Sequence, residues 1–232
     1  YNNNEIITNK YNGKEEKDPF AQRIKQLEEE TVKARFKWAE HYDDFKRIVN
    51  DTRMSKGEVL LCRRKKDNEY VVLKVKKVLK FGIDGTVKSE GFIKAEHRLN
   101  LFEVHFLEKL AKYYHPHIVK LNAVWVVEKF YEVYIEFEQC ETNMGSVMKT
   151  KKYNFSIREA ADFLRQAVLA LRYCHLNGII HADVKEENLL IKDNKIKLCD
   201  FDMARQANSS DPRGLIPTQN NMNDFRYQPI EL

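Results

Sequence analysis

A short polar loop between two apolar strands constrains this chain more than any other feature. The loop places Asp183, Lys185 and Asn188 between apolar residues 178–180 and 189–191, and a second strand then delivers Asp200. A carboxylate such as Asp183 can orient a hydroxyl group and accept its proton. Asn188 and Asp200 offer the hard oxygen ligands that suit Mg²⁺ bound to phosphates. An ordinary hairpin does not require these four residue types at these offsets, so the pattern indicates a site for chemistry.

Residues 181–188 (H-A-D-V-K-E-E-N) and 200–202 (D-F-D) resemble the catalytic loop and the metal-binding loop of the eukaryotic protein kinases, H-R-D-x-K-x-x-N and D-F-G. The resemblance implies a bilobal α+β fold, with a five-stranded antiparallel N-terminal lobe that carries one helix and a mainly helical C-terminal lobe. It implies that Asp183 is the catalytic base, that Lys185 steadies the transferred phosphoryl group, and that Asn188 and Asp200 bind Mg²⁺. The Lys185 position resembles the Ser/Thr kinases rather than the tyrosine kinases.

Four segments are expected along the chain. Residues 1–17 are rich in Asn, Lys and Glu and read as a polar tail. Residues 18–41 predict an amphipathic helix that begins with Asp-Pro and either packs against its own domain or docks a partner protein. Residues 42–140 resemble a kinase N-terminal lobe and hinge. Residues 141–232 resemble a C-terminal lobe that stops just after the A-P-E segment, so we expect that lobe to be partial.

The N-terminal lobe is expected to begin as an antiparallel meander from residue 42 to residue 75. Its third strand reads V-V-L-K where the kinases have V-A-I-K, which implies that Lys74 holds the α- and β-phosphates of ATP. A lysine in a strand ordinarily faces solvent, so this interpretation depends on a partner for its charge.

Glu103 is the expected partner, on a helix predicted over residues 92–114. The buried face of that helix is expected to comprise Leu99, Phe102, Phe106, Leu107 and Leu110. Glu103 shares this face, and a buried carboxylate needs a cation. We therefore predict a Lys74–Glu103 ion pair. Glu96 and Glu108 are expected to be solvated.

Two further strands, 119–127 and 130–138, lead to a segment that resembles the kinase hinge. Phe137 falls at the gatekeeper position, where its ring would close the rear of the adenine site. The residues that the resemblance assigns to ATP, besides Lys74 and Glu103, are Gly57, Val59, Val72, Phe137, Glu138, Cys140 and Leu190.

The second lobe opens with a helix marked at both ends. Ser156 and Glu159 form a capping box, and Gly178 ends the helix. The expected apolar stripe comprises Ala160, Phe163, Leu164, Ala167, Leu171 and Cys174. In a partial lobe, we expect an apolar face to remain exposed under the catalytic loop. Residues 200–231 resemble an activation segment, with four candidate phosphorylation sites at Ser209, Ser210, Thr218 and Tyr227.

Several departures from the family pattern affect activity. Thr52 and Met54 stand where the phosphate-binding loop has two glycines, whose lack of a side chain lets backbone N–H groups approach phosphates. Val72 replaces the usual Ala over adenine. Asp202 replaces the Gly of D-F-G, and Ala182 replaces the Arg that pairs with a phosphorylated activation segment.

Composition limits the remaining possibilities. The 232 residues carry a formal net charge of +5, spread over interspersed Lys and Glu, which disfavours nucleic acid as a partner. No apolar run is long enough to span a membrane. Four cysteines without paired spacing favour a reducing compartment, the cytoplasm or the nucleus; we expect Cys140, Cys174 and Cys199 to be core residues.

The sequence therefore predicts a Ser/Thr protein kinase that transfers the γ-phosphoryl group of Mg-ATP to protein hydroxyl groups, with activity reduced by these departures. The alternative is a pseudokinase that acts as a scaffold or regulatory subunit of a protein complex. A protein substrate or complex partner is expected in either case.

Overall fold

The computed structural model describes residues 22, 26, 38–48, 57–78, 86–127, 131–152 and 154–207. The expected tail at 1–17, most of the expected helix at 18–41, the glycine-replacing Thr52 and Met54, and all four candidate phosphorylation sites lie outside these residues. Of the predicted N-terminal helix, the structure describes a last turn, α3 (Trp38–His41).

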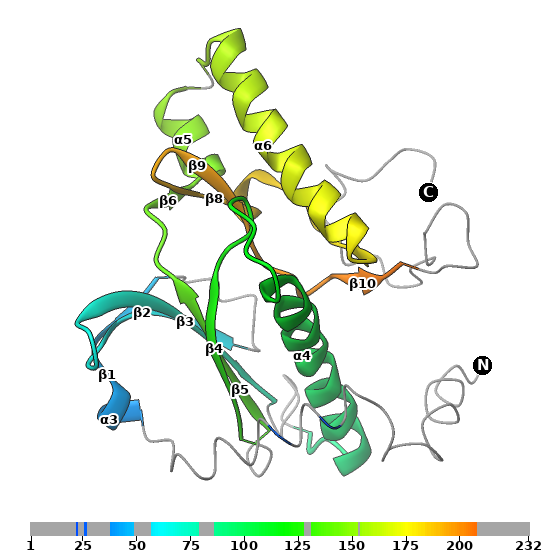
Figure 1. Ribbon diagram of the computed structural model, residues 1–232. Helices are drawn as coiled ribbons and strands as arrows, with labels where there is room; N and C mark the ends of the chain where they lie inside the picture. The colour runs from blue at the N-terminus through cyan, green and yellow to red at the C-terminus, as the bar shows by residue number, and fades with distance from the viewer. Residues whose placement is uncertain are drawn as a thin grey trace.

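A five-stranded antiparallel sheet forms one half of the molecule (Figure 1). Its strands are β1 (Tyr42–Arg47), β2 (Gly57–Arg64), β3 (Glu69–Lys77), β4 (Leu121–Val127) and β5 (Glu132–Glu138). They lie in the order β1-β2-β3-β5-β4. The long helix α4 (Glu90–Ala111) packs against β4 and β5. This arrangement confirms the predicted α+β fold class.

The central strand β3 shows how the sheet separates its two faces. Successive side chains of a strand point to opposite faces. Val71, Leu73 and Val75 are buried in a cluster with Tyr42, Cys62 and Tyr134. The intervening Val72, Lys74 and Lys76 turn toward α4, where Val72 packs against the main core. The alternation therefore presents two lysines to the same helix.

The buried face of α4 differs from the predicted one. Phe106, Leu107 and Leu110 are buried as expected, but Leu99 is 63% exposed and Phe102 is 39% exposed. The buried face includes Glu103, as predicted, and also three polar residues that were not expected there, Glu96, His97 and Asn100. A prediction based on hydrophobicity assigns polar residues to solvent, so the buried face that it predicts for α4 differs from the observed one. The expectation that Glu96 is solvated was wrong, because Glu96 is buried and pairs with Lys88 at 2.9 Å.

The first residues of the expected strand 119–127 pair elsewhere. Strand β4 begins at Leu121, and the backbone N–H of Val119 instead donates to the carbonyl of Leu198 at 3.0 Å. Leu198 belongs to β9, so this contact joins the sheet half of the molecule to the half that carries the catalytic loop.

The second half contains α5 (Met144–Thr150), α6 (Ile157–Leu176) and several short strands. Strands β6 (Thr142–Asn143), β8 (Leu189–Lys192) and β9 (Lys195–Leu198) form one small sheet, and β7 (Ile179–Ile180) pairs with β10 (Arg205–Gln206) in another. Helix α6 packs against β7 and β9. The short 3-10 helix η3 (Glu186–Asn188) precedes β8.

The predicted ends of helix α6 are confirmed, but part of its predicted buried apolar stripe was wrong. The reciprocal capping box of Ser156 and Glu159 is present, and Gly178 adopts φ +67°, a conformation that only glycine adopts without cost. Ala160 and Leu164 are exposed, however. Of the three cysteines expected in the core, Cys174 is buried, whereas Cys140 and Cys199 are only partly buried; Cys62 is buried as well. Among the described residues, no helix has the length and apolarity that a membrane span requires.

Candidate functional site

The predicted ion pair between β3 and α4 is present. Lys74 Nζ lies 2.8 Å from Glu103 Oε1, and the Glu103 side chain is 1% exposed. Residues 74 and 103 meet because β3 turns Lys74 toward α4 and α4 buries Glu103 on the facing side. Lys74 Nζ also lies 2.7 Å from Asp200 Oδ1, so one ammonium joins the sheet, α4 and the loop that carries Asp200.

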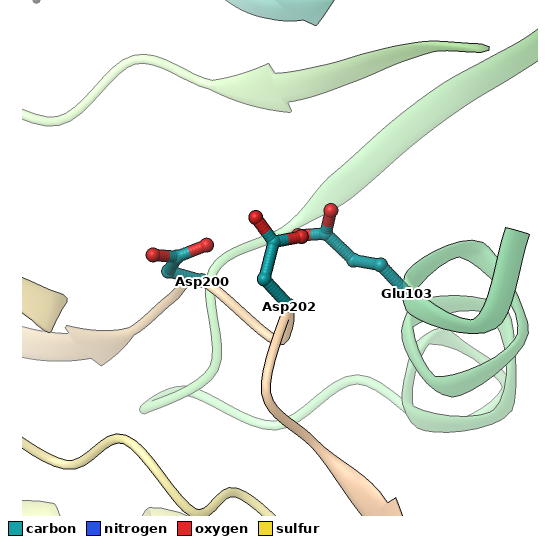
Figure 2. Close-up of side chains that lie close together, drawn as sticks. All are labelled: Glu103, Asp200 and Asp202. Carbon is teal, nitrogen blue, oxygen red and sulfur yellow. The ribbon is translucent and has the colours of Figure 1, made fainter. Parts of the chain in front are cut away.

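Asp202 brings a third carboxylate to this point. Carboxylate oxygens of Glu103, Asp200 and Asp202 all lie within 4.8 Å of one another, and Figure 2 shows the three side chains turned toward a common centre. Lys74 Nζ lies 3.1 Å from Asp202 Oδ2, farther than from the other two carboxylates. Asp202 does not adopt a positive φ, so the backbone here does not demand the glycine that the family pattern has.

Lys76 is the member of this cluster that sequence reasoning missed. Its Nζ contacts Glu103 Oε2 at 2.8 Å and forms a short ion pair with Asp202 Oδ1. The side chain is only 9% exposed. A signal existed in the sequence: Lys76 follows Lys74 by two residues and so shares its face of the strand. We call Lys74, Lys76, Glu103, Asp200 and Asp202 the five-residue charge cluster.

The charge cluster shifts the protonation of its members. Burial alone would lower the pKa of Lys74, but Asp200, Asp202 and Glu103 raise it well above its ordinary value. Burial raises the pKa of Glu103 to about 7, against the pull of both lysines. Burial would also raise the pKa of Asp202, yet Lys74 and Lys76 hold it below its usual range. Lys74 therefore remains a cation next to Asp200.

A second polar cluster forms around Asp183. Lys185 Nζ donates to Asp183 Oδ2 at 2.8 Å, and Asn188 Nδ2 donates to the same oxygen at 3.0 Å and to the Asp183 carbonyl at 2.8 Å. These bonds hold Asp183 through one carboxylate oxygen and leave Oδ1 for another donor. They also use only the amide nitrogen of Asn188, so its side-chain oxygen remains available as a ligand.

His181 ties this loop to the strand before Asp200. The backbone N–H of Asp183 donates to His181 Nδ1 at 3.3 Å, so the proton of the neutral ring is on Nε2, which donates to the Cys199 carbonyl at 2.9 Å. Burial lowers the pKa of His181 and keeps the ring neutral. Its ring also packs edge-on against the fully buried Phe201, with centroids 4.8 Å apart. One imidazole thus connects the backbone of Asp183 to the two residues that flank Asp200.

Three of the residues assigned to ATP, Val72, Phe137 and Leu190, pack in or against the main core. Phe137 is buried and pairs with Val72 across β3 and β5, and both pack in the core cluster that Leu190 also contacts. Val59 lies opposite Lys74 and Gly57 opposite Lys76 in the β2–β3 register.

The two residues that the resemblance places at the hinge are Glu138 and Cys140. The Glu138 carboxylate accepts the backbone N–H of Lys120 and pairs with Lys192 at 2.9 Å and Lys197 at 3.0 Å. Cys140 is partly buried, and burial raises the pKa of its thiol to about 11. The Glu138 side chain thus anchors this segment to the β8–β9 hairpin, and the expected contact of the Glu138 and Cys140 backbones with adenine stays a prediction.

Chemically, the two clusters suit a magnesium-bound polyphosphate. Asp200 and Asn188 each offer a hard oxygen, and Lys74 offers a cation held beside Asp200 by a buried carboxylate. Asp183 offers a carboxylate oxygen for a hydroxyl group, with Lys185 next to it. These donor types fit phosphoryl transfer, in which catalysis is positioning and charge stabilisation.

Comparisons with known proteins agree with this chemistry. A family model described as protein kinase domain matches residues 55–231. Cyclin-dependent kinase F-3 of Oryza sativa subsp. japonica is 39% identical over 121 residues, covering 52% of this chain and 27% of that protein. Cyclin-dependent kinase G1 of Arabidopsis thaliana is 31% identical over 169 residues, covering 72% and 26%.

A third relative carries a different name. The Wee1-like protein kinase of Arabidopsis thaliana is 30% identical over 141 residues, covering 61% of this chain and 26% of that protein. The chain thus spans about a quarter of the length of each of these curated relatives.

Proposed function

Because this chain belongs to the protein kinase domain family, we propose that it is a Ser/Thr protein kinase that uses Mg-ATP. The observation that carries the proposal is the double contact of Lys74, which lies 2.8 Å from Glu103 and 2.7 Å from Asp200. The contact supports the proposal because it includes the Lys–Glu ion pair that this family uses in phosphoryl transfer and brings that pair to the expected Mg²⁺ ligand Asp200.

Each polar residue then has a defined task. Lys74 binds phosphate oxygens, Glu103 fixes Lys74, and Asn188 and Asp200 hold Mg²⁺. When bound, Mg-ATP supplies the phosphoryl group and the metal charge that neutralises it. Asp183 Oδ1 accepts the proton of a protein hydroxyl, while Lys185 keeps the other oxygen occupied and balances negative charge.

The alternative function is a pseudokinase that assembles a protein complex. Asp202 favours it, because an extra carboxylate next to Lys74 competes with phosphates for that cation. The two functions share the fold and differ in turnover.

Binding is tested first. Thermal unfolding with increasing Mg-ATP should show a rising midpoint, as ligand binding to the native state requires. Lys74→Ala should abolish the rise. No rise at millimolar Mg-ATP would favour the scaffold function.

Turnover is tested with a matched pair of isosteric variants. Asp183→Asn should lower phosphoryl transfer to protein by roughly 10²–10⁴-fold, the usual contribution of a general base, and should leave nucleotide binding largely intact. Asp193→Asn is the control, because Asp193 is exposed in the turn between β8 and β9, at φ +50°, which Asn also tolerates. Equal loss in both variants, or no transfer by the unaltered protein, would contradict the kinase function.

A protein partner on α4 follows from the same proposal. Two of the relatives named above are cyclin-dependent kinases. Helix α4 presents Phe92, Leu99 and Phe102 to solvent, at 56%, 63% and 39% exposure. We propose that a cyclin-type regulatory protein covers this apolar stripe and sets the position of Glu103. Leu99→Asp should then abolish activation by the partner without lowering the thermal midpoint of the isolated chain.

A further inference from the structure

Lys76 and Asp202 are each unexpected at their positions, and they contact each other. Lys76 is a buried lysine in a central strand, and Asp202 stands where the kinase pattern has glycine. An ammonium buried in this way is costly unless it is paired. Lys76 has two partners, Asp202 and Glu103, which come from the metal-binding loop and from α4.

The pair leaves the charge of the site unchanged. Lys74, Glu103 and Asp200 alone carry one positive and two negative charges. Lys76 and Asp202 add one of each. Asp202 without Lys76 would leave three carboxylates around a single ammonium, in buried surroundings, whereas Lys76 without Asp202 would leave two ammonium groups and two carboxylates. Lys76 therefore compensates the charge that Asp202 adds.

We propose that Lys76 and Asp202 form a paired positioning device, in which Lys76 draws the Asp202 carboxylate toward α4 and so keeps Lys74 committed to Glu103 and Asp200. The distances support this division, because Lys74 Nζ lies farther from Asp202 (3.1 Å) than from Asp200 (2.7 Å) or Glu103 (2.8 Å). The device ties the metal-binding loop to α4 by side chains, where the family pattern has a flexible glycine.

The same contacts argue against an additional metal centre at Asp202. Two ammonium groups already occupy the space between the three carboxylates. Buried carboxylates that are paired with lysines have their negative charge compensated. The cluster is therefore better described as an ion-pair network than as an empty cation site.

A double-mutant cycle, measured by thermal unfolding in the absence of nucleotide, tests the pairing of Lys76 with Asp202 separately from ATP binding. We expect Lys76→Met to lower the unfolding midpoint, and Lys76→Met combined with Asp202→Asn to restore part of that loss, because the second change removes the charge that the first left unpaired. Lys77→Met is the matched control: its neighbour Lys77 is exposed and pairs with Glu132 at 3.3 Å, so the midpoint should barely move.

Two results would overturn the pairing. If the decreases in unfolding midpoint of the two single variants simply add in the double variant, Lys76 and Asp202 are not coupled. If Lys76→Met gives no folded protein, the double variant should still fold, and failure of both would count against compensation.

The positioning role rests on the proposed use of Mg-ATP and needs its own readout. Lys76→Met should weaken Mg-ATP binding roughly tenfold, the effect of one lost charge-assisted contact, since Asp202 then engages Lys74. Lys76→Arg and the double variant should bind within about threefold of the unaltered protein. Restored stability without restored affinity would refute the positioning role. Absence of Mg-ATP binding in the unaltered protein would instead refute the proposed function, and the thermal cycle would still decide the pairing.

Discussion

Helices α4 and α6 begin in the same way but bury different kinds of side chain. Both are long, and both begin at a serine N-cap, Ser89 and Ser156. Helix α4 buries large apolar residues together with charged ones, whereas the residues that α6 buries are mostly small: Gln166, Ala167, Ala170 and Cys174. Several large apolar side chains of α6 are exposed, with Leu164 at 66% and Leu176 at 72% exposure, while Phe163 and Leu171 are partly buried against the core clusters. Size, not only polarity, decides which face of a helix is covered.

The largest expected effect separates the two helices directly. Leu107 in α4 is 2% exposed within the main core. Leu107→Ala should lower the free energy of unfolding by about 2–5 kcal/mol, because it removes buried methyl groups and leaves a cavity. The same change at Leu164 in α6 should stay within about 0.5 kcal/mol, since that side chain already faces solvent. Urea denaturation of both variants measures the difference, and equal costs would show that the exposed face of α6 is covered in solution.

The second effect tests close packing on α6. Ala170 is fully buried, and the small residues beside it let the helix approach β7 and β9 closely. Ala170→Leu should therefore destabilise the protein by about 1–3 kcal/mol, the usual cost of overpacking a core. Ala161→Leu, at an exposed position of the same helix, is the control. A neutral Ala170→Leu would reveal a void beside α6.

These contrasts mark what the sequence could predict. The capping box of α6, its glycine stop and the meander were predictable because each depends on residues close together in the chain. The Lys74–Glu103 pair was predictable because a single buried carboxylate needed a cation.

Other features could not be read from the spacing of apolar residues. Glu96 is buried and pairs with Lys88, and Leu99 is exposed while four polar residues share the buried face of α4. Lys76 joined the site because Asp202, 126 residues away, supplies its counter-charge. Strand periodicity places Lys76 on the same face as Lys74, but it cannot identify a partner so far away in the chain. The roles assigned to Asp183, Asn188 and Asp200 remain predictions.

The third effect compares the two N-caps. The backbone N–H of Glu159 donates to the Ser156 hydroxyl at 3.2 Å, and the backbone N–H of Ser156 donates to the Glu159 carboxylate at 2.9 Å. Ser89 only accepts, from the N–H of Phe92 at 3.3 Å. The Ser156 hydroxyl also donates to the Glu159 carboxylate at 2.8 Å, so Ser156→Ala removes two hydroxyl bonds where Ser89→Ala removes one. Ser156→Ala should therefore cost about 1 kcal/mol, and Ser89→Ala less. Chemical denaturation should rank them in this order, and the reverse order would contradict a contribution from the second hydroxyl bond.

The smallest effect appears only as a dependence on pH. Hydrogen bonds from Lys151 and from the backbone and hydroxyl of Ser156 lower the pKa of Glu159 to about 2. A carboxyl group whose pKa falls on folding stabilises the native state above its unfolded pKa, about 4.5, and this contribution disappears as the pH falls through the folded pKa. The difference in thermal midpoint between the unaltered protein and Glu159→Gln should therefore be largest near pH 7 and shrink as the pH approaches 2. In α4, Glu90 pairs only with Lys94, at 2.7 Å, so Glu90→Gln should show a weaker dependence in the same direction. If the difference in thermal midpoint between the unaltered protein and Glu159→Gln stayed constant from pH 7 to pH 3, the charge of the Glu159 carboxylate would not contribute to the stability of the capping box.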